Sequence, residues 1–190
     1  MTEQPVSVLF VCLGNICRST MAEGVFRNIA QKPPYKGLIS KVDSCGTDSR
    51  TMATLEDHGI TDYHHAGRKV QLSSRTPRAL RTRPWRRHAT AADANCLDKQ
   101  VSPSDFNKFD YIFAMDRSNL RDLQNLQQRG NPDSKAKVML FGEFSGGRRP
   151  EVVDDPYYGG DEGFSKAYEQ CTRFSGNFLK HVFPNIDPKA

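Results

Sequence analysis

Short apolar runs alternate along the chain with longer segments in which apolar residues recur at helical spacing. The runs are rich in β-branched and aromatic residues, which predicts buried strands at Val6–Val11, Leu38–Val42, Tyr111–Met115 and Val138–Phe141. The helical spacing predicts helices from about Ser19 to Lys32-Pro33-Pro34, over Met52–His58, through Leu120, Leu123 and Leu126, and from Phe164 to Phe178. Strands that alternate with helices indicate a parallel sheet covered on both faces. The pattern therefore predicts a single α/β domain with four parallel strands, whose ligands bind beyond the carboxyl ends of the strands.

The composition supports one domain in a reducing compartment. A chain of 190 residues with 37% apolar residues can bury one core and hardly two. No apolar run approaches the length of a membrane span, and Met1–Pro5 lacks the basic residues of a signal peptide. The five cysteines are odd in number and scattered, which favours free thiols over a disulfide framework. We therefore expect a cytoplasmic protein.

The net charge of +5 comes from one stretch of the chain. Residues 71–100 hold seven basic and two acidic residues, which accounts for the whole excess, and they also hold the single tryptophan, Trp85. A basic run of this kind could bind nucleic acid or an anionic surface. No nucleic-acid-binding motif accompanies it, so we interpret it as a solvated insertion and expect neither nucleic acid nor a membrane as a partner.

A candidate phosphate-binding loop follows the first predicted strand, in the run Cys12-Leu13-Gly14-Asn15-Ile16-Cys17-Arg18-Ser19. A loop between a buried strand and the start of a helix points backbone N–H groups inward and adds the positive end of the helix dipole. Gly14 and Asn15 are residue types that tolerate the left-handed backbone such a loop requires. Arg18 can hold two phosphate oxygens with its planar fork.

The same loop would activate a nucleophile. A helix N-terminus and a neighbouring cation favour the thiolate, so Cys12 is expected to be ionised and Ser19 to donate a hydrogen bond to it. The alternative is that Cys12 is a small buried hydrophobic residue in a strand-to-helix turn.

A candidate general acid lies in Val152-Val-Asp-Asp-Pro-Tyr-Tyr158. A thiolate that attacks a phosphate monoester needs a proton donor for the leaving oxygen. Pro156 restrains Asp155 to an extended conformation, so Asp155 ranks ahead of Asp154. Tyr157 and Tyr158 could wall a pocket for an aromatic leaving group. The alternative is an ordinary surface Asp-Pro turn.

Together these motifs resemble the low-molecular-weight protein tyrosine phosphatase family. The resemblance rests on Val8–Ser19, Phe109–Ile112, Met115–Leu120 and Asp155–Gly159. It implies a cofactor-free and metal-free hydrolase, also described as an acid phosphatase, that acts on phosphotyrosine proteins and small aryl phosphates through a cysteinyl-phosphate intermediate. It further implies that Cys12 is the nucleophile, that Arg18 binds phosphate and the transition state, and that Asp155 is the acid and later the base. The implied phosphate and substrate contacts come from Leu13, Gly14, Asn15, Ile16, Cys17, Ser19, Tyr157 and Tyr158.

The resemblance also implies supporting residues. His65, or its neighbour His64, matches a histidine that hydrogen-bonds the loop asparagine. Cys17 matches a second cysteine that can trap oxidised Cys12 as a reversible disulfide, the alternative being a core thiol. Asp116 resembles a supporting residue. Ser118 is expected to cap the helix that follows it.

The chain departs from the family pattern in two places. The family-like domain spans 6–182, with a tail at 183–190, and is interrupted by the basic insertion at about 70–100, whose removal restores a family-like junction. We hypothesise that the insertion derives from a retained intron. Between Gly46-Thr47 and Arg50-Thr51 only two residues replace a longer family loop that carries an aromatic at the mouth of the site.

These departures leave two other functions open. One is a catalytically impaired phosphate-binding or interaction protein. The other is a thioredoxin-coupled arsenate reductase, which shares the nucleophile loop but needs a further pair of cysteines, whereas Cys96 stands alone and Asp155-Pro156 is present.

Overall fold

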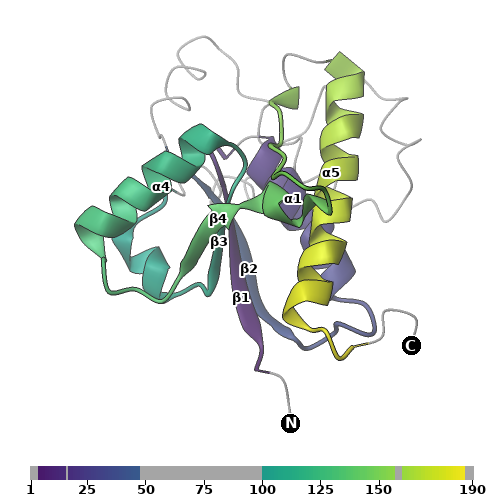
Figure 1. Ribbon diagram of the computed structural model, residues 1–190, viewed down its shortest axis with the longest axis horizontal. Helices are drawn as coiled ribbons and strands as arrows, with labels where there is room; N and C mark the ends of the chain where they lie inside the picture. Colours follow the sequence, from purple (N-terminus) through teal and green to yellow (C-terminus); the bar gives the residue numbers. More distant parts are fainter. Residues whose placement is uncertain (1–3, 16, 48–99, 157–159, 187–190) are drawn as a thin grey trace, which may run out of the picture.

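Four parallel strands form the centre of the structure, a computed structural model that describes residues 4–15, 17–47, 100–156 and 160–186 (Figure 1). The strands lie in the order β2-β1-β3-β4. Along the chain the elements are β1 (Val6–Cys12), α1 (Arg18–Ala30), β2 (Ile39–Gly46), η4 (Pro103–Asn107), β3 (Tyr111–Ala114), α4 (Arg117–Gly130), β4 (Lys137–Leu140), η5 (Phe141–Ser145) and α5 (Gly160–Val182). The predicted single α/β domain with a four-stranded parallel sheet is confirmed.

The second strand is longer than its apolar pattern predicts, because it extends to Gly46 through polar residues. Ser44 is buried, and its Oγ donates a hydrogen bond to Glu23 Oε2 of α1 at 2.7 Å. Such hydrogen-bond partners let polar side chains occupy a buried strand. The apolar pattern of the sequence therefore does not predict the second half of β2. The helix predicted over Met52–His58 lies outside the described residues.

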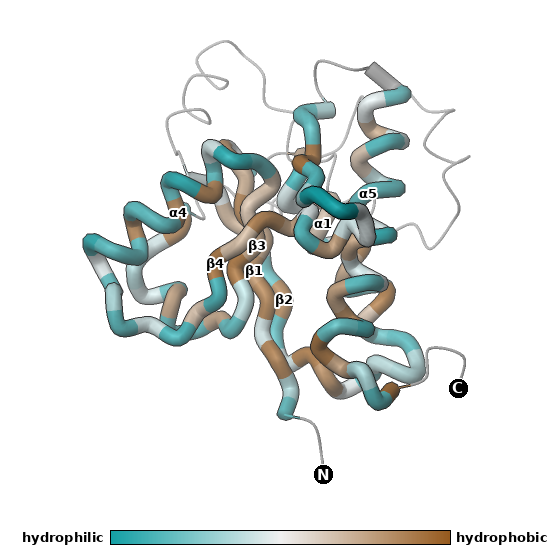
Figure 2. Tube along the Cα trace, viewed as in Figure 1, coloured by the Kyte–Doolittle hydropathy of each residue, from teal (hydrophilic) through white to brown (hydrophobic). Residues whose placement is uncertain are grey.

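Helices cover both faces of the sheet, with α1 and α5 on one side and α4 on the other (Figure 1). Successive residues of β1 point to opposite faces, so Val8 and Phe10 pack toward α1 and α5, whereas Leu9 and Val11 pack in the cluster that includes Leu123 of α4. In Figure 2 the central strands are largely hydrophobic, and hydrophilic residues run along much of α4.

Aspartate caps the start of α4, which corrects the prediction made for Ser118. Asp116 has extended backbone dihedrals and accepts a hydrogen bond from the Asn119 N–H through Oδ1 at 2.8 Å. Ser118 already lies inside the first turn of the helix, where its side chain cannot act as the cap. The cap residue is therefore the one that directly follows β3 and Met115.

The carboxyl ends of the strands bring distant segments together. Cys12 at the end of β1 pairs with Gly46 at the end of β2, and Gly46 in turn bridges to Gln100. The Val101 N–H donates to the Gly46 carbonyl at 2.9 Å, and the Gln100 amide donates to the Thr47 carbonyl at 3.2 Å. Thr47 and Gln100, which are 53 residues apart in the sequence, thus lie side by side. No helix in the described ranges is both long and apolar enough to cross a membrane.

Candidate active site

A cysteine, a serine and an asparagine form a chain of hydrogen bonds in the loop after β1. Cys12 Sγ lies 3.1 Å from Ser19 Oγ, and Ser19 Oγ lies 2.8 Å from Asn15 Oδ1. A serine hydroxyl has one proton to donate. When Cys12 is a thiol, its S–H donates to Ser19, which donates to Asn15. When Cys12 is a thiolate, the Ser19 hydroxyl must turn and donate to the sulfur.

The loop holds this geometry through its backbone. Asn15 has a φ of 52°, the left-handed conformation that its residue type tolerates better than most. Helix α1 begins at Arg18 without a side-chain cap and without an acidic residue in its first turn. The N–H groups of that turn therefore remain available to an anion held in the loop.

Gly46 supports the loop from the adjacent strand, and the sequence analysis did not assign it a role. A Cβ atom at Gly46 would lie 2.8 Å from the Leu13 carbonyl oxygen and 3.2 Å from both Asn15 N and Gly14 C. The neighbouring Thr47 N–H donates to the carbonyls of Cys12 at 3.0 Å and Leu13 at 2.9 Å. A glycine at the end of a strand is a known sign of close backbone approach, and that signal was present in the sequence.

Arg18 is oriented by a carboxylate at the end of β3. Its side chain is 9% exposed, and its Nη1 donates to Asp116 Oδ2 at 2.6 Å and to the Val153 carbonyl at 3.4 Å. Burial alone would lower the pKa of Arg18, but the charge of Cys12, the hydrogen bond that Arg18 donates to Asp116 and the charge of Asp155 together raise it above its usual value. Arg18 is therefore a fixed cation beside the loop.

The two candidate acids occupy different environments. Asp155 Oδ2 lies 3.5 Å from Arg18 Nη2, so its carboxylate faces the nucleophile loop across the guanidinium. Asp154 instead accepts a hydrogen bond from Lys166 Nζ at 2.8 Å, and both of those side chains are more than 60% exposed. The structure thus brings Asp155, rather than Asp154, together with Arg18.

The other predicted residues are divided by what the structure describes. Leu13 is 42% exposed at the rim of the loop, and Gly14 is buried within it. Cys17 is half-buried, and burial, followed by the charges of Asp155 and Cys12, raises the pKa of its thiol to about 12. Ile16, Tyr157, Tyr158, His64 and His65 lie outside the described residues, as do residues 48–50 and the insertion up to Lys99. Across the described ranges, no three His, Cys, Asp or Glu side chains gather as metal ligands would.

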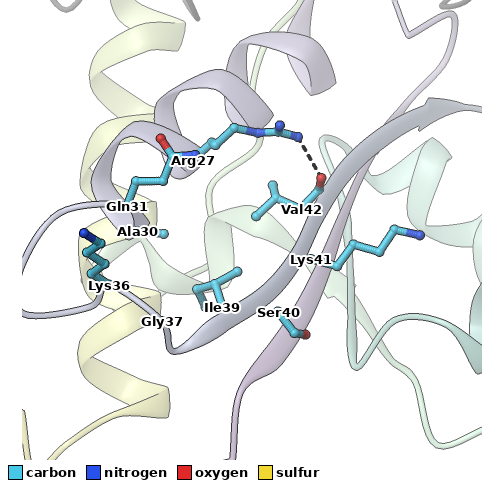
Figure 3. A pocket seen from close by; sticks show the side chains of 9 residues that line it. All are labelled: Arg27, Ala30, Gln31, Lys36, Gly37, Ile39, Ser40, Lys41 and Val42. Atoms are coloured by element: carbon cyan, nitrogen blue, oxygen red, sulfur yellow. Dashed lines mark hydrogen bonds between the residues drawn. The ribbon is translucent and has the colours of Figure 1, made fainter.

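A separate groove of about 630 Å³ lies between the last turn of α1 and the start of β2 (Figure 3). Arg27 crosses its rim and donates to the Val42 carbonyl at 2.8 Å, and Lys36 is among the other residues that line the groove. None of the residues that line it carries a thiol or a carboxylate. It also lies at the amino end of β2, whereas Cys12 lies beside the carboxyl end. The groove therefore belongs to no part of the nucleophile site.

Known proteins match the sequence of this chain over most of its length. The family model for low molecular weight phosphotyrosine protein phosphatase matches residues 7–88 and 75–186. A protein of that name from Schizosaccharomyces pombe is 41% identical over 186 residues, which cover 93% of this chain and 97% of the relative. The human protein of the same name is 35% identical, with 95% and 98% covered.

Solved structures agree with the sequence matches. The crystal structure of a Drosophila arginine phosphatase is 31% identical, has a TM-score of 0.61, and covers 92% of this chain and 96% of its own. The crystal structure of a protein tyrosine phosphatase from Entamoeba histolytica is 29% identical, with a TM-score of 0.61 and coverage of 95% and 98%.

Proposed function

Because the chain belongs to the low molecular weight phosphotyrosine protein phosphatase family, we propose that it hydrolyses phosphate monoesters at the Cys12 loop. The Cys12 thiolate attacks phosphorus in line with the ester bond and forms an S–P bond. The P–O bond to the leaving group breaks, and protonated Asp155 gives its proton to the departing oxygen. The product of this step is a cysteinyl-phosphate.

The second step restores the enzyme. Asp155, now a carboxylate, takes a proton from a water molecule as the water attacks phosphorus. The S–P bond breaks and Cys12 leaves as a thiolate, which Ser19 stabilises because its hydroxyl can turn toward the sulfur. Arg18 and the backbone N–H groups of the loop hold the equatorial oxygens in both steps, so the charge that develops there meets fixed donors.

One observation carries this proposal: the Arg18 guanidinium lies between a carboxylate that orients it and a carboxylate that can act as an acid. Asp116 fixes one edge of the guanidinium at 2.6 Å, and Asp155 faces the other nitrogen at 3.5 Å. Both contacts are made by the arginine that follows the cysteine loop directly. Phosphate bound by that loop would therefore lie within reach of the nucleophile and the acid.

The first experiment is hydrolysis of p-nitrophenyl phosphate without added metal. We expect Cys12→Ser to abolish turnover, because a serine hydroxyl is not ionised at neutral pH and is a much weaker nucleophile than a thiolate. Cys45→Ser is the matched control, since both cysteines are 3% exposed at the ends of neighbouring strands. Turnover that survives Cys12→Ser would contradict the thiol mechanism. Phosphate binding by folded wild-type protein without turnover would instead support the impaired binding protein.

A second pair of variants tests the acid. Asp155→Asn should lower kcat for phenyl phosphate by roughly 10²-fold or more, which is the usual contribution of a general acid. Asp154→Asn should cost much less, because that carboxylate pairs with Lys166 at the surface. Equal losses in the two variants would contradict the assignment.

The substrate class is inferred from the relatives, and the compartment is inferred from the cysteines. We propose phosphotyrosine proteins as substrates, because the curated relatives bear that name. Release of phosphate from phosphotyrosyl and phosphoarginyl peptides of one sequence would test the choice, and preference for the phosphoarginyl peptide would contradict it. We also propose a cytoplasmic location, because an odd number of scattered cysteines favours free thiols over a disulfide framework.

A further inference from the structure

One face of α5 follows the segment that carries Asp155, so this inference rests on the proposed function. The segment runs from η5 through residues 146–156, and α5 runs beside it in the opposite direction. Five residues of α5, spaced alternately three and four positions apart, contact the segment in reverse order: Asn177, Arg173, Gln170, Lys166 and Gly163. This spacing places them on one side of the helix. We refer to these five residues as the α5 stripe.

The two ends of the stripe fix the two ends of the segment. Asn177 Nδ2 donates to the Phe144 carbonyl at 2.8 Å. At the other end, a Cβ atom at Gly163 would lie 3.0 Å from the Pro156 carbonyl oxygen, so the helix backbone packs closely against the residue after Asp155. These two contacts therefore fix both ends of the segment on α5.

Arg173 makes the strongest set of contacts in the stripe. Its Nη1 donates to Glu151 Oε1 at 2.8 Å and to the Ser145 carbonyl at 2.5 Å, and its Nη2 donates to Glu151 Oε2 at 2.9 Å. Two parallel hydrogen bonds between a guanidinium and a carboxylate fix direction as well as distance. The Glu151 N–H also donates to the Gly142 carbonyl at 3.1 Å. Glu151 is thus held on both its backbone and its side chain.

Gln170 extends this support toward the acid. It is 6% exposed, and its Nε2 donates to Glu151 Oε2 at 3.0 Å and to the Val152 carbonyl at 3.1 Å. Its Oε1 atom is buried and has no hydrogen-bond partner in the described structure. A buried acceptor without a partner costs stability. The Gln170 amide thus contacts the segment only through its NH2 group, which holds Val152, three residues before Asp155.

We propose that the α5 stripe sets the position of the general acid, with Arg173 and Gln170 as positioning residues. The next residue after Val152 is buried Val153, whose N–H donates to the Met115 carbonyl at 2.8 Å and whose carbonyl lies 3.4 Å from Arg18 Nη1. Asp155 follows two positions later. Because the segment is held at Glu151, Val152 and Val153, the Asp155 carboxylate is placed beside Arg18. Loss of the paired hydrogen bonds between Arg173 and Glu151 would let Asp155 move away from that position.

The test compares Arg173→Ala with Lys180→Ala, which removes the same charge from an exposed position of α5. Phenyl phosphate needs a proton donor for its leaving group more than p-nitrophenyl phosphate does. We expect Arg173→Ala to lower kcat/KM, which reports formation of the cysteinyl-phosphate, roughly tenfold for phenyl phosphate and less than about threefold for p-nitrophenyl phosphate. In an Asp155→Asn background the same change should cost no more than about twofold, because the acid is already absent. An equal loss on both substrates, or a loss that persists fully in that background, overturns the proposal.

A second variant and a second readout separate positioning from folding and from the proposed function. Glu151→Gln removes the charge of the fork with little change of shape, and it should reproduce the leaving-group effect if Arg173→Ala does not fold. Hydrogen exchange reads the segment without turnover: the Val153 amide should lose protection in Arg173→Ala and keep it in Lys180→Ala. Unchanged protection overturns the positioning role even in a protein without activity. Absence of turnover in wild type would overturn only the proposed function.

Discussion

Substitution of Gly46 by alanine should displace the nucleophile loop without touching any group that reacts. The added Cβ would lie 2.8 Å from the Leu13 carbonyl oxygen, whereas ordinary contacts of a Cβ atom begin at 3.4 Å. The overlap, the difference of these two distances, is 0.6 Å. The other two contacts, at 3.2 Å, are also with backbone atoms of the loop, so no flexible side chain can move aside.

The magnitude follows from how the loop is held. The Leu13 carbonyl also accepts the Thr47 N–H at 2.9 Å, so it cannot retreat from the new methyl group without stretching that hydrogen bond. A misplacement of about 1 Å at a reacting centre can cost roughly 10²-fold in rate. A shift of about half that size predicts a loss on the order of tenfold in kcat/KM. The overpacking should also lower the free energy of unfolding by about 1–3 kcal/mol.

The assay has three parts, namely kcat/KM for p-nitrophenyl phosphate, the inhibition constant of inorganic phosphate, and the melting temperature. Gly176→Ala is the matched control, since a Cβ there meets nothing within 4 Å and the residue lies inside α5. That change should raise stability by about 0.5–1 kcal/mol, because alanine favours a helix over glycine. If Gly46→Ala retained wild-type kcat/KM and phosphate inhibition, close packing at Gly46 would not be what positions the loop.

Three further predictions follow from other contacts. Asp116→Ala should lower the free energy of unfolding by about 1 kcal/mol through loss of the α4 cap, whereas Asp116→Asn should keep the cap. Both variants should raise the inhibition constant of phosphate, because Arg18 loses its charged partner. An unchanged inhibition constant in both variants would contradict this role of Asp116. The hydrogen bonds from Arg173 lower the pKa of Glu151 from 4.5 to about 2. The stability that this ion pair contributes is therefore fully present above about pH 4.5 and is lost as the pH falls toward 2. The melting temperatures of wild type and Glu151→Gln should converge over that interval and differ by a constant amount above it. Burial raises the pKa of Cys17 to about 12, so iodoacetamide at neutral pH should leave this thiol unmodified in the folded protein, and rapid alkylation seen by mass spectrometry would refute the expectation.

The fold was predictable because its strands are short apolar runs and its helices have one apolar face. Val6–Val11 and Tyr111–Met115 predict the central strands almost to the residue, since strands covered on both faces need apolar residues throughout. β2 was predicted too short because its second half is polar. The sequence does not show that Glu23, on a helix far along the chain from Ser44, supplies the partner that lets it be buried.

The candidate site divides in the same way. Cys12, Arg18 and Asp155 could be found because each stands in a local motif whose spacing has a chemical meaning. The supporting residues on α5 could not be found by spacing alone. The α5 stripe lies beside the apolar residues of the same helix, and a polar stripe in that place predicts a solvated surface. The α5 stripe makes contacts only because residues 144–156 lie against it in the folded chain.

Thr47 and Gln100, which flank residues 48–99 in the chain, lie side by side at the carboxyl ends of the strands. The proposed nucleophile lies on β1, the proposed phosphate-binding arginine lies on α1, and the proposed acid lies on the segment that contacts α5. Both departures that the sequence predicts from the family pattern fall almost wholly between Thr47 and Gln100, which are joined by a hydrogen bond at 3.2 Å. Segments that leave and return at one point can change length at little cost in closure entropy. We therefore expect the described fold to tolerate changes in the length of residues 48–99, while the steps at phosphorus depend on Gly46, Asp116 and the α5 stripe.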